Sequence, residues 1–164
     1  MTTLAQTTPS LSALPAPLAR VLATDDAWTP TIARLVLGAV MLPHGLQKTF
    51  GLFGGYGFEG TMGFFTGTMG LPWIVAFLVI VIESVGALAL LFGLASRLAA
   101  LGVAAVMAGA ALTTHLSFGF FMNWDGSAAG EGFEFHLLAI GLAAVVTLAG
   151  GGKASLDARL TRRR

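Results

Sequence analysis

The chain has 164 residues, of which 55% are hydrophobic and 10% are charged, and its formal net charge at pH 7 is +1. Soluble domains carry about a quarter charged residues, so this composition is typical of a membrane protein. The near-neutral charge gives no sign of a nucleic-acid partner, and the absence of cysteine excludes a disulfide framework and an iron–sulfur cluster bound by this chain.

Residues 1–27 are rich in Thr, Ser and Pro, and no basic start followed by an apolar core marks a signal peptide. We expect a flexible N-terminal tail here. The alternative is a short surface helix that begins after Pro15 or Pro17 and places Leu18 and Leu22 on one apolar stripe.

Four apolar runs follow, over residues 31–50, 71–94, 98–118 and 133–150. A helix needs about 20 apolar residues to cross roughly 30 Å of hydrocarbon. The core of a soluble protein would account for one such run, but not for a set that nearly fills the chain. We therefore predict an all-α fold, an integral membrane four-helix bundle over residues 28–152, followed by a basic C-terminal tail over residues 153–164.

Positive charges gather on one side of these predicted spans. Arg20 precedes the first span, Arg97 lies in the turn between the second and third, and Lys153 and several arginines follow the fourth. The other side holds Asp125 and Glu131 and no arginine. Because positive charge marks the cytoplasmic side, we expect both termini in the cytoplasm. The outer loops, rich in Gly and aromatic residues, are expected to form a lid.

Few ionisable side chains lie within the spans. With a rise of about 1.5 Å per residue, Glu83 falls near mid-membrane, His44 and His115 in the outer half, and Lys48 near the outer surface. An ionised carboxylate at the bilayer centre costs at least about 2.5 kcal/mol. We therefore expect Glu83 to be protonated, or paired with one of these residues in a polar pocket. The alternative is that these residues only bond helices together, which is the role we assign to Arg34.

Side-chain periodicity gives three further expectations. Ala76, Ile80, Ala87 and Leu90 share the face of Glu83. A small-residue stripe on the third span is expected to pack tightly and to deliver His115: Arg97, Leu101, Ala104, Ala108, Ala111 and His115. On the fourth span, Glu131 and Glu134 share one face and His136 points away from it.

Three classes of chemistry fit this set of residues: a quinone or quinol site, a small proton or solute transporter, and a membrane anchor or assembly subunit. A quinone site needs hydrogen bonds to the carbonyl oxygens and a group that exchanges protons, which His and Glu supply. A haem on His44 and His115 is disfavoured by the nearby glutamate. A bare metal site of these two histidines with Glu83 has no dedicated ligand spacing in its favour.

The motifs "RLVLGAVMLPHGLQKTFG", "IESVGALALLFGLASRLAAL", "HLSFGFFMNWDG" and "EFHLLAIGLA", in this order, resemble the DoxX family of small four-helix membrane proteins. The family's recurring polar and glycine positions correspond here to Arg34, Gly45, Lys48, Glu83, Gly86, His115, Glu134 and His136. The resemblance implies a bacterial inner-membrane protein, since family members are described as subunits of a quinol oxidase or a thiosulfate:quinone oxidoreductase. A related branch is linked to disulfide chemistry, which a chain without cysteine cannot perform alone.

From the residues and this resemblance, we predict a multi-pass membrane subunit of a redox assembly that binds quinone. Glu83 and His115 are the candidate catalytic residues. The candidate binding residues are His44, Lys48, Glu134 and His136. We expect no metal, haem or iron–sulfur cluster in this chain. The expected partners are membrane lipid and either other redox subunits or further copies of the chain, and whether the chain is itself an enzyme stays open.

Overall fold

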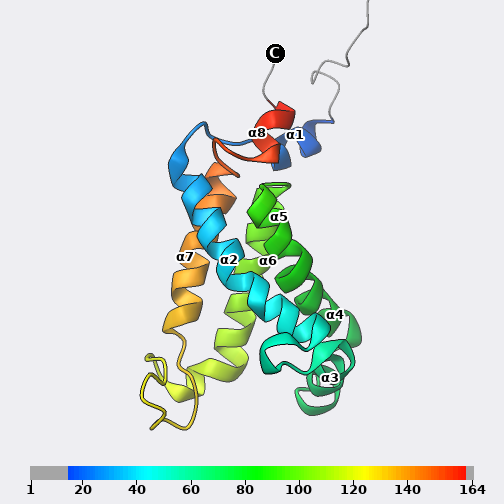
Figure 1. The fold of residues 1–164 in the computed structure, drawn as a ribbon, viewed down its shortest axis with the longest axis vertical. Coiled ribbons are helices and arrows are strands. Elements are labelled where there is room, and N and C mark those ends of the chain that lie inside the picture. The colour runs from blue at the N-terminus through cyan, green and yellow to red at the C-terminus, as the bar shows by residue number, and fades with distance from the viewer. Residues whose placement is uncertain (1–14, 162–164) are drawn as a thin grey trace, which may run out of the picture.

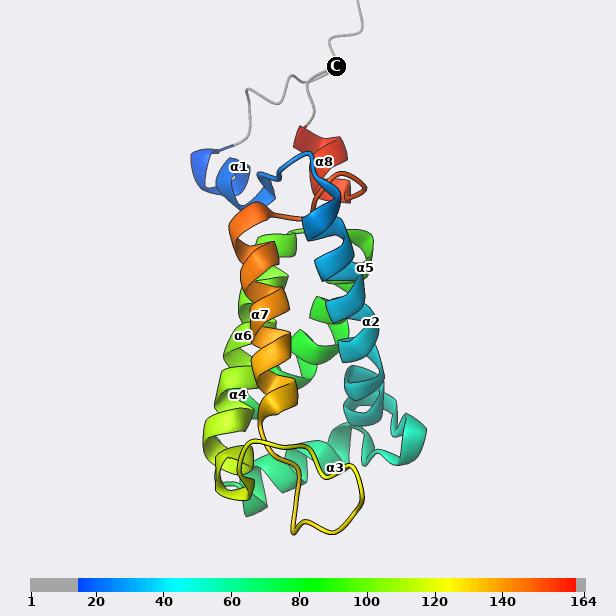
Figure 2. The same ribbon diagram turned by 90° about the vertical axis from the view of Figure 1, so that its left-hand side faces the viewer.

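The computed structural model describes residues 15–161, and this part of the chain consists of helices and loops without a strand. Four long helical stretches run along the long axis of the molecule (Figures 1 and 2). They are α2 (Trp28–Phe50); α4 (Trp73–Val81) with η4 (Ile82–Gly86) and α5 (Ala87–Phe92); α6 (Ser96–Ala110) with η5 (Ala111–His115) and η6 (Leu116–Phe118); and α7 (Glu134–Ala149).

Short elements cover both ends of these stretches. The inner end, as we call it, carries α1 (Ala16–Leu22) and α8 (Leu156–Thr161), and the outer end carries η2 (Leu52–Gly54), α3 (Gly57–Gly63), η3 (Phe64–Thr68) and the loop 119–133 (Figure 1). The flexible tail expected over residues 1–27 is therefore wrong for residues 16–22, where the alternative helix after Pro15 forms. Residues 1–14 of that tail, and residues 162–164 of the expected basic tail, lie outside the described part.

The buried core runs between the long stretches. On the second stretch, Ala76, Ile80, Ala87 and Leu90 are buried together with Glu83, which confirms the predicted face. On α6 the predicted stripe is right in part: Ala104 packs against the core that contains Ala100, Val103 and Met107, whereas Leu101 is 56% exposed. Helix α6 packs most extensively on α7.

Arg34 ties the inner end together. Its side chain is 2% exposed, and Nε donates to the carbonyl of Gly151 at 2.7 Å. Nη1 donates to the carbonyls of Leu90 and Leu91, each at 2.7 Å, and Nη2 donates to that of Ala154. Carbonyls at a helix C-terminus lack intrahelical partners, so Arg34 satisfies the end of α5 and joins it to the chain after α7. The structural role assigned to Arg34 agrees with this network.

A short turn separates α5 from α6, and a second buried charge fixes it. Gly93 has φ +70°, and a Cβ placed there would lie 2.4 Å from Cβ of Ser155, so only glycine fits. The carboxylate of Asp157, on α8, accepts hydrogen bonds from the backbone N–H groups of Ala95 and Ser96 at 2.7 and 2.9 Å. These bonds cap the first turn of α6, where a negative charge is favourable. Helix α8 is therefore packed on the inner end.

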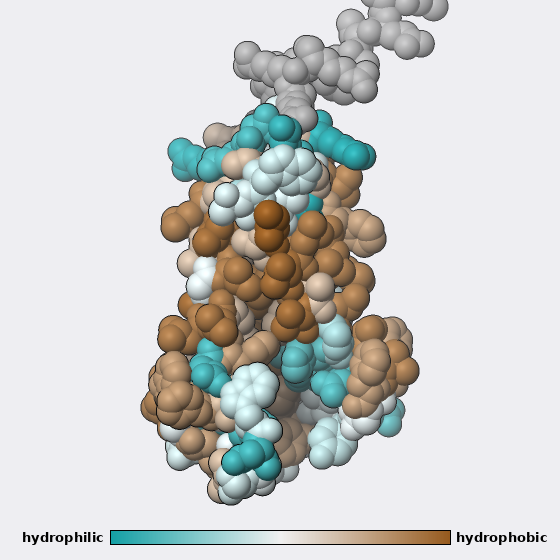
Figure 3. Space-filling model, turned by 60° about the vertical axis from the view of Figure 1, so that its left-hand side comes forward, coloured by the Kyte–Doolittle hydropathy of each residue, from teal (hydrophilic) through white to brown (hydrophobic). Residues whose placement is uncertain are grey.

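Two stretches, Trp73–Phe92 and Ser96–Phe118, are long and apolar enough to cross a membrane. Most of their residues are not buried inside the protein, unlike those of the core helix of a soluble protein. Figure 3 shows an apolar band around the middle of one face, between more polar residues at the two ends. Helix α7 is also apolar but has 16 residues. Crossing by α2 and α7 stays a prediction.

Candidate functional site

The centre of the candidate site is an ion pair between two helical stretches. Glu83, on η4, is 3% exposed, and its Oε2 lies 2.5 Å from Nζ of Lys48, in the last turn of α2. Of the partners expected for Glu83, the structure thus provides Lys48. The pair is a close charge contact without an aligned hydrogen bond to Oε2. An ammonium carries three N–H donors, so Lys48 retains capacity to bind another acceptor.

A glycine brings the two helical backbones together at this pair. A Cβ placed on Gly45 would lie 2.4 Å from the carbonyl oxygen of Glu83, so no other residue fits without a shift of backbone. Next to it, Oγ of Ser84 lies 2.7 Å from Oγ1 of Thr49 and donates to the carbonyl of Gly45 at 3.2 Å. These contacts fix the height of Lys48 relative to Glu83. The close approach of α2 and η4 is therefore what builds the pair.

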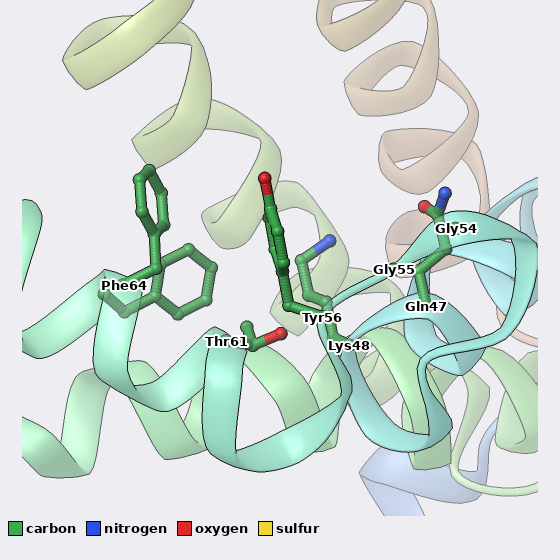
Figure 4. A pocket seen from close by; sticks show the side chains of 8 residues that line it. Gln47, Lys48, Gly54, Gly55, Tyr56, Thr61 and Phe64 are labelled. Atoms are coloured by element: carbon green, nitrogen blue, oxygen red, sulfur yellow. The ribbon is translucent and has the colours of Figure 1, made fainter.

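Lys48 also lines a hollow of about 280 Å³ at the outer end. The remaining lining residues come from the end of α2 and from the segment after it: Gln47, Gly54, Gly55, Tyr56, Thr61, Phe64 and Phe65. In the view of Figure 4, the ring of Tyr56 stands between Phe64 and the side chain of Lys48. The hollow thus combines an ammonium group, two hydroxyls and an amide with aromatic rings.

Sequence reasoning missed part of this lining. The sequence predicts an aromatic, Gly-rich lid after α2 and assigns no role in the site to Gln47, Tyr56 or Thr61. A usable signal was present, because Tyr56 is the single tyrosine of the chain and interrupts a run of Gly and Phe. The segment also folds into the short helices α3 and η3, which place Thr61 and Phe64 against the hollow.

The imidazoles form a second group, beside the ion pair. The ring centroids of His115 and His136 are 4.1 Å apart, and His44 packs on Phe135 at 5.9 Å. His44 is close enough to interact electrostatically with Lys48 and Glu83. Among the described residues, no hydrogen bond or ion pair joins Glu83 to an imidazole. The expected meeting of His44 and His115 with Glu83 is therefore replaced by a pairing of His115 with His136.

Two carboxylates are occupied by the loop 119–133. Oε1 of Glu134 accepts hydrogen bonds from the backbone N–H of Met122 at 2.9 Å and from Nε1 of Trp124 at 3.0 Å. Oε2 of Glu131 accepts one from the backbone N–H of Asn123 at 2.7 Å. His136 is buried. Glu131 lies in the loop before α7, which begins at Glu134, so the helical face expected to be shared by the two glutamates is wrong. Binding of a ligand by Glu134 or His136 stays a prediction.

Three π-helical turns contribute to this region. They are η3, which carries Phe64, η4, which carries Glu83, and η5, which ends at His115. A π turn adds a residue to a helical turn and is found frequently at functional sites. It also rotates the residues that follow, which the regular spacing of 3.6 residues per turn cannot predict. In the described residues, no group of three or more His, Asp or Glu side chains is arranged to hold a metal ion.

Comparison with known proteins places these residues in a family context. The family model described as DoxX matches residues 29–116, a span that includes Lys48, Glu83 and His115 but ends before α7. A protein of Bacillus subtilis (strain 168) named "Putative oxidoreductase CatD" is 35% identical over 92 residues, which cover 56% of this chain and 63% of that protein. The match thus spans less than two thirds of the relative. No solved structure matches the chain.

Proposed function

Because this chain belongs to the DoxX family, we propose that it is a membrane subunit of a redox assembly and binds a quinone or quinol in the hollow beside Lys48. The observation that carries the proposal is the double role of this lysine, which pairs with the buried Glu83 and also lines the hollow. The name of the Bacillus subtilis relative, an oxidoreductase, supports a redox role.

The proposal places the protein in the inner membrane of a bacterium with all four long helical stretches crossing. Two of these stretches are long and apolar enough by themselves, and the apolar band of Figure 3 supports the placement. Both α1 and α8 lie at the inner end together with Arg20, Arg97 and Arg159 (Figure 1). By the excess of positive charge, this end faces the cytoplasm. The hollow then opens on the outer side.

The lining of the hollow suits a single quinone ring. Its volume of about 280 Å³ falls just below the usual range of ligand pockets, about 300–1,000 Å³. A larger flat cofactor would not fit without rearrangement. Lys48 and the hydroxyls of Tyr56 and Thr61 can donate hydrogen bonds to carbonyl oxygens, while Phe64 and Phe65 provide apolar contact.

Lys48 and Glu83 would take part in the proton transfer that accompanies quinone reduction. A quinone takes up electrons and protons in equal number when it becomes a quinol. Lys48 would orient a carbonyl oxygen through its ammonium group, and the carboxyl group of Glu83 would hold or release a proton next to it. The electron carrier would belong to a partner subunit. Membrane lipid, and either such subunits or further copies of this chain, are the partners that the proposal includes.

Binding of a short-tailed ubiquinone analogue to the purified full chain in detergent tests this proposal. We expect Glu83→Gln and Lys48→Met each to weaken binding at least tenfold, about 1.4 kcal/mol. Glu59→Gln is the matched control, because Glu59 is an exposed carboxylate on α3. Unchanged affinity in both test variants would remove the quinone site.

The alternative is a non-enzymatic anchor or assembly factor for a partner oxidoreductase. The observation in its favour is the exposure of large aromatic side chains on the loop 119–133, where Trp124 is 85% exposed. It predicts that a soluble partner co-purifies with the chain and that the Glu83→Gln variant loses stability without a measurable ligand effect. A small proton or solute transporter would instead show flux in liposomes that the same variant abolishes.

A further inference from the structure

His136 is buried with an unsatisfied ring nitrogen. The side chain is 6% exposed, and among the described residues its Nδ1 has no hydrogen-bond partner. Buried polar atoms are nearly always paired, so a purely structural histidine at this position would be expected to use both nitrogens. Buried polar atoms without a protein partner are commonly satisfied by an ordered water molecule.

His115 connects this buried ring to the outer loop. The two ring centroids are 4.1 Å apart, and Nδ1 of His115 lies 2.8 Å from the carbonyl oxygen of Glu131. In the neutral ring, Nδ1–H must donate to that carbonyl, which leaves the lone pair of Nε2 free to accept a proton. His115 is half-buried and lies at the end of η5, so it stands between the interior and the loop 119–133.

His44 connects the imidazole pair to the ion pair. It precedes Lys48 by four residues on α2, so both side chains lie on the same face of the helix. It packs on Phe135, which in turn packs on His136 with ring centroids 5.6 Å apart. His44 is close enough to interact electrostatically with Lys48, with Glu83 and with His136.

We propose that His44, His136 and His115 form a water-assisted proton path between the Lys48–Glu83 pair and the outer loop. Each imidazole accepts a proton at one ring nitrogen and releases one from the other, so the path carries protons without net change. Bridging water would occupy the gaps, including the position at Nδ1 of His136. The path rests on the proposed function in one respect: the quinone reaction is what supplies or consumes the proton.

The surroundings of the path leave few competing groups. Lys48 and Glu83 are the charged groups where the proposed path begins. At its outer end, the carboxylates of Glu131 and Glu134 accept hydrogen bonds from the loop 119–133. Phe135 lies beside the path and cannot take up a proton. Leu138 lies on the same helix and is 70% exposed, so Leu138→Ala removes no proton acceptor and is a suitable control.

The test is the rate at which Glu83 exchanges protons with solvent. The full chain in detergent is subjected to a rapid drop in pH, and time-resolved infrared spectroscopy records the absorption band of protonated carboxyl groups. The part of this band that is missing in the Glu83→Gln variant is assigned to Glu83. We expect His136→Gln and His115→Phe each to slow the appearance of this band at least tenfold, with its final amplitude unchanged. Leu138→Ala should leave the rate within about twofold of the wild type.

An unchanged rate in His115→Phe and in the double variant with His136→Gln would overturn the path. If His136→Gln fails to fold, His115→Phe at the half-buried position still decides the question, and restoration of its rate by added imidazole would support the path. The infrared measurement needs no quinone. If the wild-type chain binds no quinone but the histidine variants exchange protons more slowly, the proposed function is refuted and the path is supported. If the chain binds quinone but the histidine variants exchange protons at the wild-type rate, only the path is refuted.

Discussion

Nζ of Lys48 and Oε2 of Glu83 lie 2.5 Å apart, although the two residues belong to helical stretches separated by the whole outer segment 51–72. Only 5% of the Glu83 side chain is accessible, against 23% of the Lys48 side chain. The buried carboxylate thus depends on a cation that reaches it from the mouth of a hollow. Because Lys48 lines the hollow, a ligand in the hollow can reach the ion pair.

The first prediction concerns the stability of this pair. Lys48→Met should lower the free energy of unfolding by about 3–5 kcal/mol, because it leaves a buried carboxylate without its cation. The double variant Lys48→Met/Glu83→Gln should recover at least half of that loss. Equilibrium unfolding in mixed detergent measures both. If the double variant is no more stable than Lys48→Met, the contribution of Lys48 to stability does not come from its ion pair with Glu83.

The second prediction concerns the contact of α2 with η4. Gly45→Ala should cost about 1–3 kcal/mol, because the new methyl group overlaps the backbone of Glu83 and Ser84. Gly109→Ala is the matched control, since a Cβ at Gly109 meets nothing within 4 Å. There, alanine should stabilise the helix by up to about 1 kcal/mol. Equal effects of the two substitutions on thermal unfolding would contradict the close approach.

The third prediction separates the inner end from the site. Arg34→Met should destabilise the protein by at least about 3 kcal/mol, because it removes the charged donor that joins the carbonyl oxygens of Gly151, Leu91 and Ala154. Arg20→Met, at an exposed position of α1, should change stability by less than about 0.5 kcal/mol. The fraction of Arg34→Met that folds should bind the quinone analogue normally. Loss of binding in that folded fraction would show that Arg34 acts on the hollow.

The fourth prediction concerns the lining of the hollow. Tyr56→Phe removes one hydroxyl and keeps the ring, so it should weaken quinone binding about two- to tenfold, the usual range for one neutral hydrogen bond. Phe53→Leu is the control, because Phe53 is 69% exposed and does not line the hollow. Titration of both variants with the same analogue measures the difference. Equal affinities would mean that Tyr56 contributes no hydrogen bond.

The apolar runs predicted where helices would form, and the face shared by Glu83, Ala87 and Leu90 was readable from spacing alone. Spacing was less informative on α6, where Ala104 of the expected stripe packs against the core but Leu101 is exposed. A stripe of small residues suits close packing and lipid contact equally well. Spacing also could not anticipate the π turn η5 at the end of that stretch.

The candidate site was predictable in its chemistry and not in its pairing. A carboxylate within an apolar run requires a partner, and this requirement pointed to Lys48 and the histidines. Which of them meets Glu83 depends on Gly45, which sets the depth at which α2 approaches η4. Tyr56 and Thr61 come from an outer segment whose folding into α3 depends on contacts with the rest of the protein. A single sequence carries little information about such contacts.

The most direct measurement of the central claim is photoaffinity labelling of the membrane-reconstituted full chain with an azido-ubiquinone, read by peptide mass spectrometry. The account predicts that the label falls on residues 47–65, around Lys48 and Tyr56, and that excess unlabelled quinone displaces it. Label confined to the lipid-facing surfaces of α6 and α7, or label that excess quinone does not displace, would contradict a quinone site in this hollow.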